Sequence, residues 1–395
     1  MKCVTPLLAW ECAGMRRGLP GKRNKIYDRR MAYSTITSLD TDAALQKSRD
    51  LRARLLSTSS DTYVTGPAGS GDGERVVVLG GTGYIGRALV PELARRGYRP
   101  VVLARDASVK DDAEFADAEV VAGDPTRAED VANVVAMAPT AVVISLLSGR
   151  RPNDAEECRL VDYDAVVNGI KAAVAHDVQQ FIQISDFGAY RPELIPQVYK
   201  LQVEGELMGQ HHGALPWTIV RPTAYYPYLS MTFGDVKNGL PYRIFDHGEY
   251  NVVNPIGRED LAEFITNQVL APEALGRVLP VGGPWDADNV VTLKDAGQMM
   301  FDITGREPQW DVVPMTTWDK KIARLRRIGK MSKKVAPVAY YLEAAKYWSV
   351  VDHVAPAYGT QTLRGFMDKL KDREFPTGSF RERMKSGTAM MPTDI

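Results

Sequence analysis

The sequence predicts an α/β protein, a doubly wound parallel Rossmann sheet with a smaller C-terminal lobe that covers the substrate. Residues 76–86, VVVLGGTGYIG, join an apolar run to clustered glycines and a helix-like segment, as a strand, a phosphate loop and a helix start would. A second apolar run, 100–104, begins where the next strand of a βαβ unit is expected. Apolar strands then alternate with helical patterns up to about residue 222, which predicts a parallel sheet with helices on both faces.

The glycine loop is expected to bind a pyrophosphate. Gly81 allows the tight turn, Gly83 lets the backbone approach the phosphates, and Gly86 lets the helix pack close to the strand. Gly80, Gly83 and Gly86 fit a second register equally well. The free N–H groups at the helix start then receive the phosphates. The cofactor-binding residues predicted here are Gly80, Gly81, Thr82, Gly83, Tyr84, Ile85 and Gly86.

The end of the second strand is expected to select the cofactor. Arg105 suits the 2′-phosphate of NADP, whereas a carboxylate there would bind the ribose hydroxyls of NAD. Arg87 could assist, so we predict NADPH. The alternative is that Arg105 is solvated and Asp106 only caps the next turn. Asp124 is expected either near the adenine or as the cap of the helix that follows.

The remaining elements follow from apolar periodicity. Up to residue 222 we expect helices at 84–97 and 158–176, and strands at 119–122, 141–146, 181–185 and 217–220. Beyond it the alternation loosens, and residues 234–256 contain Gly/Pro turns typical of an inserted lobe with a small hairpin. A short strand is expected at 278–281, and helices at 258–271, 292–304, twice within 317–349, and from Thr360.

The N-terminal segment differs from the rest. Up to Ser34 it holds eight basic and two acidic residues, and it is rich in Ser and Thr from there to Ser60. This composition is typical of an organelle transit peptide, with a disordered basic tail as the alternative. Residues 41–56 could form a short amphipathic helix. The predicted domains are a transit peptide (1–60), a flexible linker (61–73), an NADP-binding Rossmann domain (74–222), a substrate lobe with a returning strand and helices (223–375) and a C-terminal tail (376–395).

Composition excludes several classes of partner. The 49 basic and 49 acidic residues balance, so we expect no nucleic-acid partner. The sequence has no apolar stretch of about 20 residues, the length of a transmembrane helix. This leaves room for peripheral membrane or complex association. The three cysteines form no CxxC pair. Of the five histidines only His211 and His212 are close together, and adjacent side chains are poorly placed to share one metal, so we expect no metal or iron–sulfur cluster.

The chemistry is expected beyond the carboxyl ends of the strands. The fifth strand ends at Ser185, and the next helix carries Lys200. A short-chain dehydrogenase places a tyrosine four residues before the lysine, whose charge lowers the phenol pKa. Pro196 stands there instead, and Tyr199 points away at about 100° around the helix. Either the site works with Lys200 alone, or it does no chemistry.

Several restrictive segments resemble one family. They are KLQVEGELM (200–208), TIVRPTAYYPYL (218–229), VKNGLPYRIFDHGEY (236–250), NPIGREDLAEFI (254–265), VLPVGGP (278–284), TGREPQWDVVP (304–314) and AYGTQTLRGFMDKL (357–370). Together with the glycine loop and the lone lysine, they resemble the atypical short-chain dehydrogenases of the isoflavone-reductase and NmrA-like group. Within that group they are most similar to the plant-type divinyl chlorophyllide 8-vinyl-reductase family. The similarity runs from about residue 75 to 372.

The resemblance implies NADPH, a plastid location, and reduction of the 8-vinyl group of a divinyl chlorophyllide or protochlorophyllide to ethyl. It also implies a lysine without the tyrosine. The sequence departs from the family at Pro196, where an aromatic residue is common, and at Tyr225 and Tyr226, where paired phenylalanines are common. The alternative functions are an isoflavone-reductase-like enzyme, or a non-catalytic nucleotide-binding subunit or assembly factor of an organellar complex.

The candidate catalytic residues are Lys200, which could stabilise charge on the tetrapyrrole or hold the nicotinamide ribose, and Ser185, which could bridge ribose and substrate or cap a helix. The candidate substrate residues are aromatic or titratable: Tyr225, Tyr226, Tyr242 and His247. The two adjacent tyrosines could stack on the macrocycle or pack in the core. His247 could give a proton or lie exposed in the hairpin.

Overall fold

The computed structural model describes residues 41–57, 71–209, 214–329 and 336–375. The chain divides into a unit of residues 41–395 and a unit of residues 1–40. The first 40 residues of the predicted transit peptide, most of the predicted linker and the tail 376–395 lie outside the described residues.

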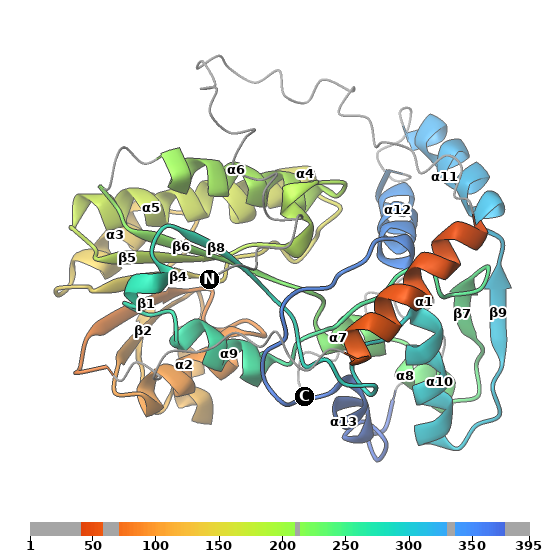
Figure 1. Ribbon diagram of the computed structural model, residues 1–395. Helices are drawn as coiled ribbons and strands as arrows, with labels where there is room; N and C mark the ends of the chain where they lie inside the picture. Colours follow the sequence, from red (N-terminus) through yellow and green to blue (C-terminus); the bar gives the residue numbers. More distant parts are fainter. Residues whose placement is uncertain (1–40, 58–70, 210–213, 330–335, 376–395) are drawn as a thin grey trace, which may run out of the picture. The chain divides into compact units, whose positions relative to one another are not determined.

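Seven parallel strands form one sheet in the order β3-β2-β1-β4-β5-β6-β8, which confirms the predicted doubly wound Rossmann sheet (Figure 1). The strands are β1 (Arg75–Leu79), β2 (Arg99–Ala104), β3 (Glu119–Ala122), β4 (Val142–Ser145), β5 (Gln180–Ile184), β6 (Trp217–Pro222) and β8 (Arg277–Val281). β1 and β4 are buried along their whole length, as expected for strands with helices on both faces. The strand order reverses between β1 and β4, which opens a crevice at their carboxyl ends.

Helices cover both faces of the sheet (Figure 1). α2 (Gly86–Arg95) and α9 (Arg258–Thr266) pack on one face through a core that includes Leu89, Leu93 and Phe264. α3 (Ala128–Ala136), α5 (Ala165–Ala175) and α6 (Ile195–Gly209) pack on the other through Val131, Ile170 and Val203. α4 (Ala155–Cys158) continues into α5 through a π-helical segment, Arg159–Asp164.

The C-terminal lobe has its own core, which contains Phe233, Met300, Phe301 and Leu363. Its elements are α7 (Tyr226–Ser230), α8 (Phe233–Lys237), β7 (Tyr242–Phe245), α10 (Leu293–Thr304), β9 (Trp310–Val313), α11 (Met315–Gly329), α12 (Ala336–Val350) and α13 (Leu363–Asp368). α9 and β8, between β7 and α10 in the sequence, return to the Rossmann half. The predicted domain boundary at residue 222 therefore does not divide the two halves cleanly, because α9 and β8 belong to the Rossmann half.

The prediction of a small hairpin within residues 234–256 is wrong. β7 pairs in parallel with β9, more than sixty residues later. After β7 the chain turns away through Asp246, which has a positive φ of 48° and whose carboxylate accepts hydrogen bonds from the Tyr250 hydroxyl (3.1 Å) and the Met315 backbone N–H (3.0 Å). These two bonds fix the turn and tie it to the start of α11.

The helix expected at 41–56 forms α1 (Thr41–Ser57), and it packs on the lobe. Leu55 is buried against Val252 and Val290. Ion pairs join Lys47 to Asp352 (2.7 Å) and Arg49 to Glu249 (3.0 Å). α1 thus belongs to the compact unit, although it lies within the span predicted as the transit peptide (1–60).

Candidate functional site

The glycine loop follows β1 and leads into α2. Gly80 has a positive φ of 83°, and a Cβ there would lie 3.2 Å from the backbone of Leu146 and Leu147. A Cβ at Gly86 would collide with the carbonyl oxygen of Gly81. Ile85 at the N-cap of α2 offers no side-chain hydrogen bond. The N–H groups of Arg87 and Ala88 donate to the carbonyl oxygens of Gly83 (3.0 Å) and Ile85 (3.1 Å), whereas no such bond is found for the N–H of Gly86, the first residue of the helix, among the described residues. The loop therefore fits a dinucleotide diphosphate.

The two arginines near the loop differ in whether their guanidinium groups are free to bind a phosphate. Arg105 lies exposed after β2, with no hydrogen bond or ion pair among the described residues. Arg87 is held by Asp112 (2.9 Å) and Glu114 (3.2 Å), so its guanidinium is already paired. Of the two arginines, Arg105 is therefore the better placed to meet a phosphate.

Two nearby aspartates cap turns. The carboxylate of Asp106 accepts from the Ser108 N–H (2.9 Å) at the start of the 3₁₀ turn Ala107–Asp111, and hydrogen bonds from the Ser108 hydroxyl and N–H lower its pKa. Asp124 accepts from the N–H and the hydroxyl of Thr126 (2.9 and 2.8 Å). Asp106 therefore caps the turn after β2, as the alternative had it. Asp124 caps the turn that precedes α3 rather than α3 itself, whose N-cap Arg127 makes no side-chain hydrogen bond.

Lys200 lies on α6 with its ammonium enclosed, and the side chain is 6% exposed. Its Nζ donates to the carbonyl oxygens of Leu147 (2.5 Å) and Ile184 (3.3 Å), at the ends of β4 and β5. Asp162 lies 3.8 Å away. Burial lowers the pKa of Lys200, and the nearby carboxylates of Asp162, Asp186 and Glu204 oppose that shift. These contacts occupy the ammonium, so Lys200 can donate to a substrate only by exchanging one of them.

Asp162 was not predicted as a site residue. It sits in the π-helical segment, where it accepts hydrogen bonds from the Ser148 hydroxyl (3.0 Å) and the Gly149 N–H (3.1 Å). Burial raises its pKa, and the attraction of Lys200 opposes the rise. π-helical turns are frequent at functional sites, but they have no simple sequence signature.

Ser185 faces a second buried charge pair. Its hydroxyl donates to Glu204 (2.5 Å), whose carboxylate also binds Arg221 through two hydrogen bonds of 3.0 and 2.6 Å. Ser185 follows β5, Glu204 lies on α6 and Arg221 on β6, so this network joins three neighbouring elements. The Ser185 proton is thus directed into the protein, which leaves only its oxygen lone pairs for a ligand.

The structure separates the four predicted substrate residues. Tyr225 lies half-buried at the start of α7, and its ring centroid is 5.9 Å from that of Tyr84 in the glycine loop. Tyr226 points the other way into the lobe core and donates to the Gln361 carbonyl oxygen (2.5 Å). Tyr242 is buried against Trp310, so neither it nor Tyr226 is placed to touch a substrate. His247 is exposed after β7.

A row of aromatic rings runs from the glycine loop into the lobe. After Tyr84 and Tyr225, Tyr228 stacks on Tyr225 (6.1 Å, 28°) and Trp348 stacks on Tyr228 (6.3 Å, 10°). We call these four residues the aromatic row. Tyr228 is 45% exposed, and Trp348 comes from α12. The TAYYPYL segment pointed to Tyr225, but no local pattern pointed to Trp348.

A buried polar network continues from the aromatic row. The His353 ring stacks on Trp348 (4.3 Å); its Nδ1 donates to the Val351 carbonyl oxygen (2.9 Å), and its Nε2 accepts from the Tyr347 hydroxyl (3.2 Å). Burial lowers the pKa of His353 to about 4, so the ring is neutral at pH 7. On the Rossmann side, Gln197 donates to the Asp186 carboxylate (3.1 Å).

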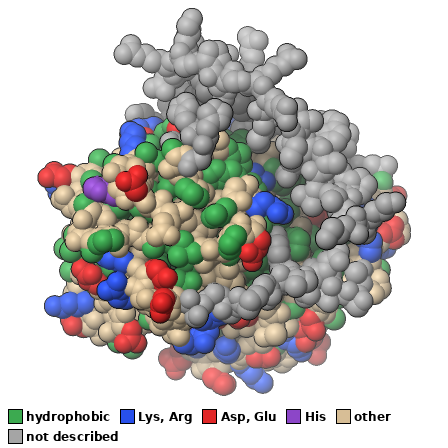
Figure 2. All heavy atoms as spheres, turned by 60° about the vertical axis from the view of Figure 1, so that its left-hand side comes forward, with side chains coloured by type: hydrophobic (Ala, Val, Ile, Leu, Met, Phe, Trp, Pro, Cys, Tyr) green, Lys and Arg blue, Asp and Glu red, His purple; other side chains and the backbone are tan. Residues whose placement is uncertain are grey.

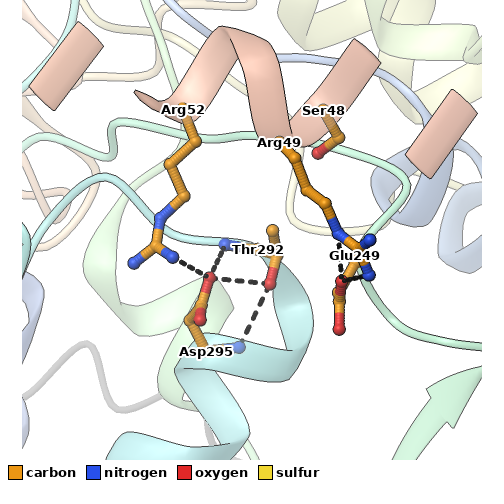
Figure 3. Close-up of a pocket in the computed structure, with 6 residues that line it drawn as sticks. All are labelled: Ser48, Arg49, Arg52, Glu249, Thr292 and Asp295. Atoms are coloured by element: carbon orange, nitrogen blue, oxygen red, sulfur yellow. Dashed lines mark hydrogen bonds and ion pairs between the residues drawn. The ribbon is translucent and has the colours of Figure 1, made fainter. Parts of the chain in front are cut away.

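A separate polar hollow lies between α1 and the lobe (Figure 3). Arg49 there pairs with Glu249, and Arg52 lies 3.5 Å from Asp295 in the capping box of α10. Both cations are paired with carboxylates, so the polar contacts of the hollow serve to attach α1 to the lobe.

Among the described residues, no cluster of His, Cys, Asp and Glu could hold a metal. Within the same ranges, no helix is long and apolar enough to span a bilayer.

Comparison with known proteins identifies the family. A family model described as NAD(P)H-binding matches residues 80–272, a span that includes the glycine loop and Lys200. A chain from Oryza sativa subsp. indica, named divinyl chlorophyllide a 8-vinyl-reductase, chloroplastic, is 32% identical over 75% of this chain and 78% of its own length. This chain belongs to the same family. A chain of the same name from Arabidopsis thaliana is 31% identical over 75% of this chain and 76% of its own.

Family membership confirms that the chain is an oxidoreductase with a nicotinamide cofactor. The word chloroplastic in these names confirms the predicted plastid location. A more distant relative, the photosystem II assembly factor Ycf39 of Trieres chinensis, is 27% identical over 56% of this chain and 69% of its own. A solved structure of Thermus thermophilus UDP-glucose 4-epimerase with NAD (TM-score 0.51, 21% identity, 61% of this chain and 86% of that one) shares the fold.

Proposed function

We propose that this protein is an NADPH-dependent reductase that converts the 8-vinyl group of a divinyl chlorophyllide or protochlorophyllide to ethyl. Family membership supports the reaction class. The observation that carries the substrate assignment is the aromatic row, which begins at Tyr84 in the glycine loop and reaches Trp348 in the lobe. Flat aromatic surfaces are suited to stacking on a flat macrocycle.

The aromatic row would position the pigment beside the cofactor. Tyr84 belongs to the loop that would hold the diphosphate, and the Arg258 guanidinium lies 5.6 Å from the centre of its ring. Tyr225 is the N-cap residue of α7, which follows β6, and Tyr228 lies within that helix. A ring system lying along these residues would therefore extend from the nicotinamide crevice toward α12. A bound reduced nicotinamide would supply the hydride, which the conjugated vinyl group can accept.

We assign Lys200 a positioning role in addition to its charge. Its Nζ donates to the carbonyl oxygen of Leu147, and the Leu146–Leu147 backbone lies against Gly80. The ammonium thereby fixes the strand end on which the glycine loop rests. Its positive charge lies just beyond β4 and at the end of β5, and it would act through the field at the crevice, where negative charge would develop on the reduced pigment. Asp162 would hold the ammonium in place.

NADPH is the proposed cofactor because Arg105 is exposed and without a protein partner among the described residues, whereas Arg87 is paired. A free guanidinium at the end of β2 suits the 2′-phosphate. We also propose that the plastid leader ends near residue 40, where the compact unit begins.

One incubation tests the proposed function. Purified protein with NADPH and divinyl chlorophyllide should yield the monovinyl product, identified by its shifted Soret absorption and its mass. Tyr228→Ala should raise KM for pigment with little effect on KM for NADPH, and Tyr228→Phe, which keeps the ring, should behave like wild type. If the pigment is unchanged while NADPH binds, the proposed reaction is refuted.

A second candidate function is a non-catalytic nucleotide-binding assembly factor. Two observations favour it: the Lys200 ammonium already donates to backbone carbonyl groups, and no tyrosine stands at position 196. The same incubation separates the two, because this candidate binds NADPH without turning over pigment.

A further inference from the structure

The hairpin of α11 and α12 carries a concentration of positive charge on its first helix. α11 contains five basic residues and one acidic residue, although the whole chain has no net charge. Ion pairs within the hairpin join Arg326 to Glu343, and Lys346 to Asp319 (2.6 Å). Figure 2, which brings the Rossmann half forward, shows acidic and basic side chains interspersed over that face.

The remaining cations of α11 share one face. At about 100° per residue, Lys320, Lys321, Arg324 and Arg327 fall within an arc of about 120°. All four are exposed, and no ion pair to them is found among the described residues. The opposite face is apolar and buried, with Met315, Trp318 and Ile322 turned into the protein. α11 is thus an amphipathic helix whose solvent face carries four basic side chains.

Apolar side chains are exposed at the end of the hairpin. Ile328 is 39% exposed in the last turn of α11, within the same arc as the four cations, and Val338 is 47% exposed in the first turn of α12. Tyr341, one turn further along α12, is 41% exposed. Exposed aliphatic residues beside Lys and Arg, with a tyrosine near them, are typical of helices that lie at a membrane interface.

The exposed side of α12 leads back to the aromatic row. Val338, Tyr341 and Trp348 recur at helical spacing, so they lie on one side of the helix. Trp348 at the inner end stacks on Tyr228. One side of α12 therefore connects the tip of the hairpin with the proposed pigment site.

We propose that the α11–α12 hairpin docks this protein on an anionic lipid surface, with Ile328 and Val338 entering the headgroup region and the four cations of α11 facing the lipid phosphates. The opposite charges attract, and the apolar tip gains by leaving water. This docking does not depend on the proposed reaction. Where that reaction holds, the exposed side of α12 gives an amphipathic pigment a path from the lipid surface to the aromatic row.

The test is binding to vesicles, without NADPH or pigment. The full chain should sediment with equimolar phosphatidylglycerol and phosphatidylcholine, and not with phosphatidylcholine alone. Replacing Lys320, Lys321, Arg324 and Arg327 together by glutamine should lower the partition coefficient by at least about a hundredfold, because each such cation contributes about fivefold. Ile328→Asn with Val338→Asn should weaken the binding that survives high salt, where charge attraction is screened.

A matched control replaces four other exposed cations, Lys110, Lys171, Arg277 and Lys369, by glutamine. It changes the net charge equally and should leave binding unchanged. Because residues 1–34 are also basic, the variants are compared again in a chain that begins at Thr41, the start of the compact unit. Equal losses in both sets of variants, or a wild-type chain that ignores anionic vesicles, would overturn the proposal. The second result would point instead to an acidic protein as the partner.

Discussion

The glycine loop and the Lys200 pocket both contact the backbone of Leu147, yet the loop is shaped by glycines and the pocket by buried charged side chains. A Cβ at Gly80 would lie 3.2 Å from the Leu147 backbone nitrogen, and Lys200 donates to the Leu147 carbonyl oxygen. The loop is made of backbone, shaped by the absence of side chains. The pocket is made of buried charges, Lys200 with Asp162 and Glu204 with Arg221. The loop should therefore be sensitive to substitutions that add a side-chain atom, whereas the pocket should be sensitive to substitutions that remove one member of a buried ion pair.

The largest effect is expected in the pocket. Lys200→Met leaves the Asp162 carboxylate buried without its cation, and breaking a buried pair costs about 3–5 kcal/mol of unfolding free energy. Asp162→Asn in the Lys200→Met background should restore part of this loss, because it removes the uncompensated charge. Urea unfolding of the single and double variants gives the coupling. Simple additivity would show that the two residues do not act as a pair.

Acid should loosen the network beyond the aromatic row. The pKa of His353 is about 4 in the folded protein against 6.5 in the unfolded chain, so the unfolded chain binds more protons between these values. Stability should therefore fall as pH drops from 6.5 to 4, by up to about 3 kcal/mol for this group. His353→Gln should flatten this part of the curve, measured as urea midpoints against pH. An unchanged slope would show that other groups dominate.

In the loop, one methyl group should be enough to abolish function. Gly86→Ala places a Cβ against the Gly81 carbonyl oxygen, and neither backbone can move without opening the turn. Overpacking costs about 1–3 kcal/mol even where side chains yield, so nucleotide affinity should fall about a hundredfold or more. Gly205→Ala, in the exposed middle of α6 with open space around it, is the control. It should stabilise the protein by about 0.5–1 kcal/mol.

The smallest effect concerns cofactor choice. Arg105→Ala should weaken NADPH binding by about 1.5–3 kcal/mol and leave NADH nearly unchanged, because only NADPH carries the 2′-phosphate. Arg87→Ala tests the competing source of charge and should change selectivity little, since Asp112 and Glu114 already hold its guanidinium. Fluorescence titrations with both nucleotides decide the matter. Loss of selectivity in Arg87→Ala alone would reassign the phosphate contact.

The same contrast explains how far the sequence could be interpreted. Glycine spacing and apolar runs are local, so they predicted the loop, the strands up to β6 and the returning strand β8. The pocket depends on residues that only the fold brings together: Asp162 reaches Lys200 through a π-helical turn, and Trp348 meets Tyr228 from another helix. Tyr225 and Tyr226 show the limit within one segment. The pair was predicted together, but the chain enters α7 between them and directs one ring to the crevice and the other to the core.

The attachment of α1 has a consequence for the order of folding. Its hydrogen-bond partners lie about 200 to 305 residues downstream, at Glu249, Val290 and Asp352. A chain that enters a compartment with its N-terminus first presents this helix long before those partners arrive. Because loop closure must precede such distant contacts, α1 is expected to dock after the sheet has formed. Until then its leucines stay exposed to solvent or to chaperones. The first helix of the compact unit is therefore expected to be among the last elements to pack.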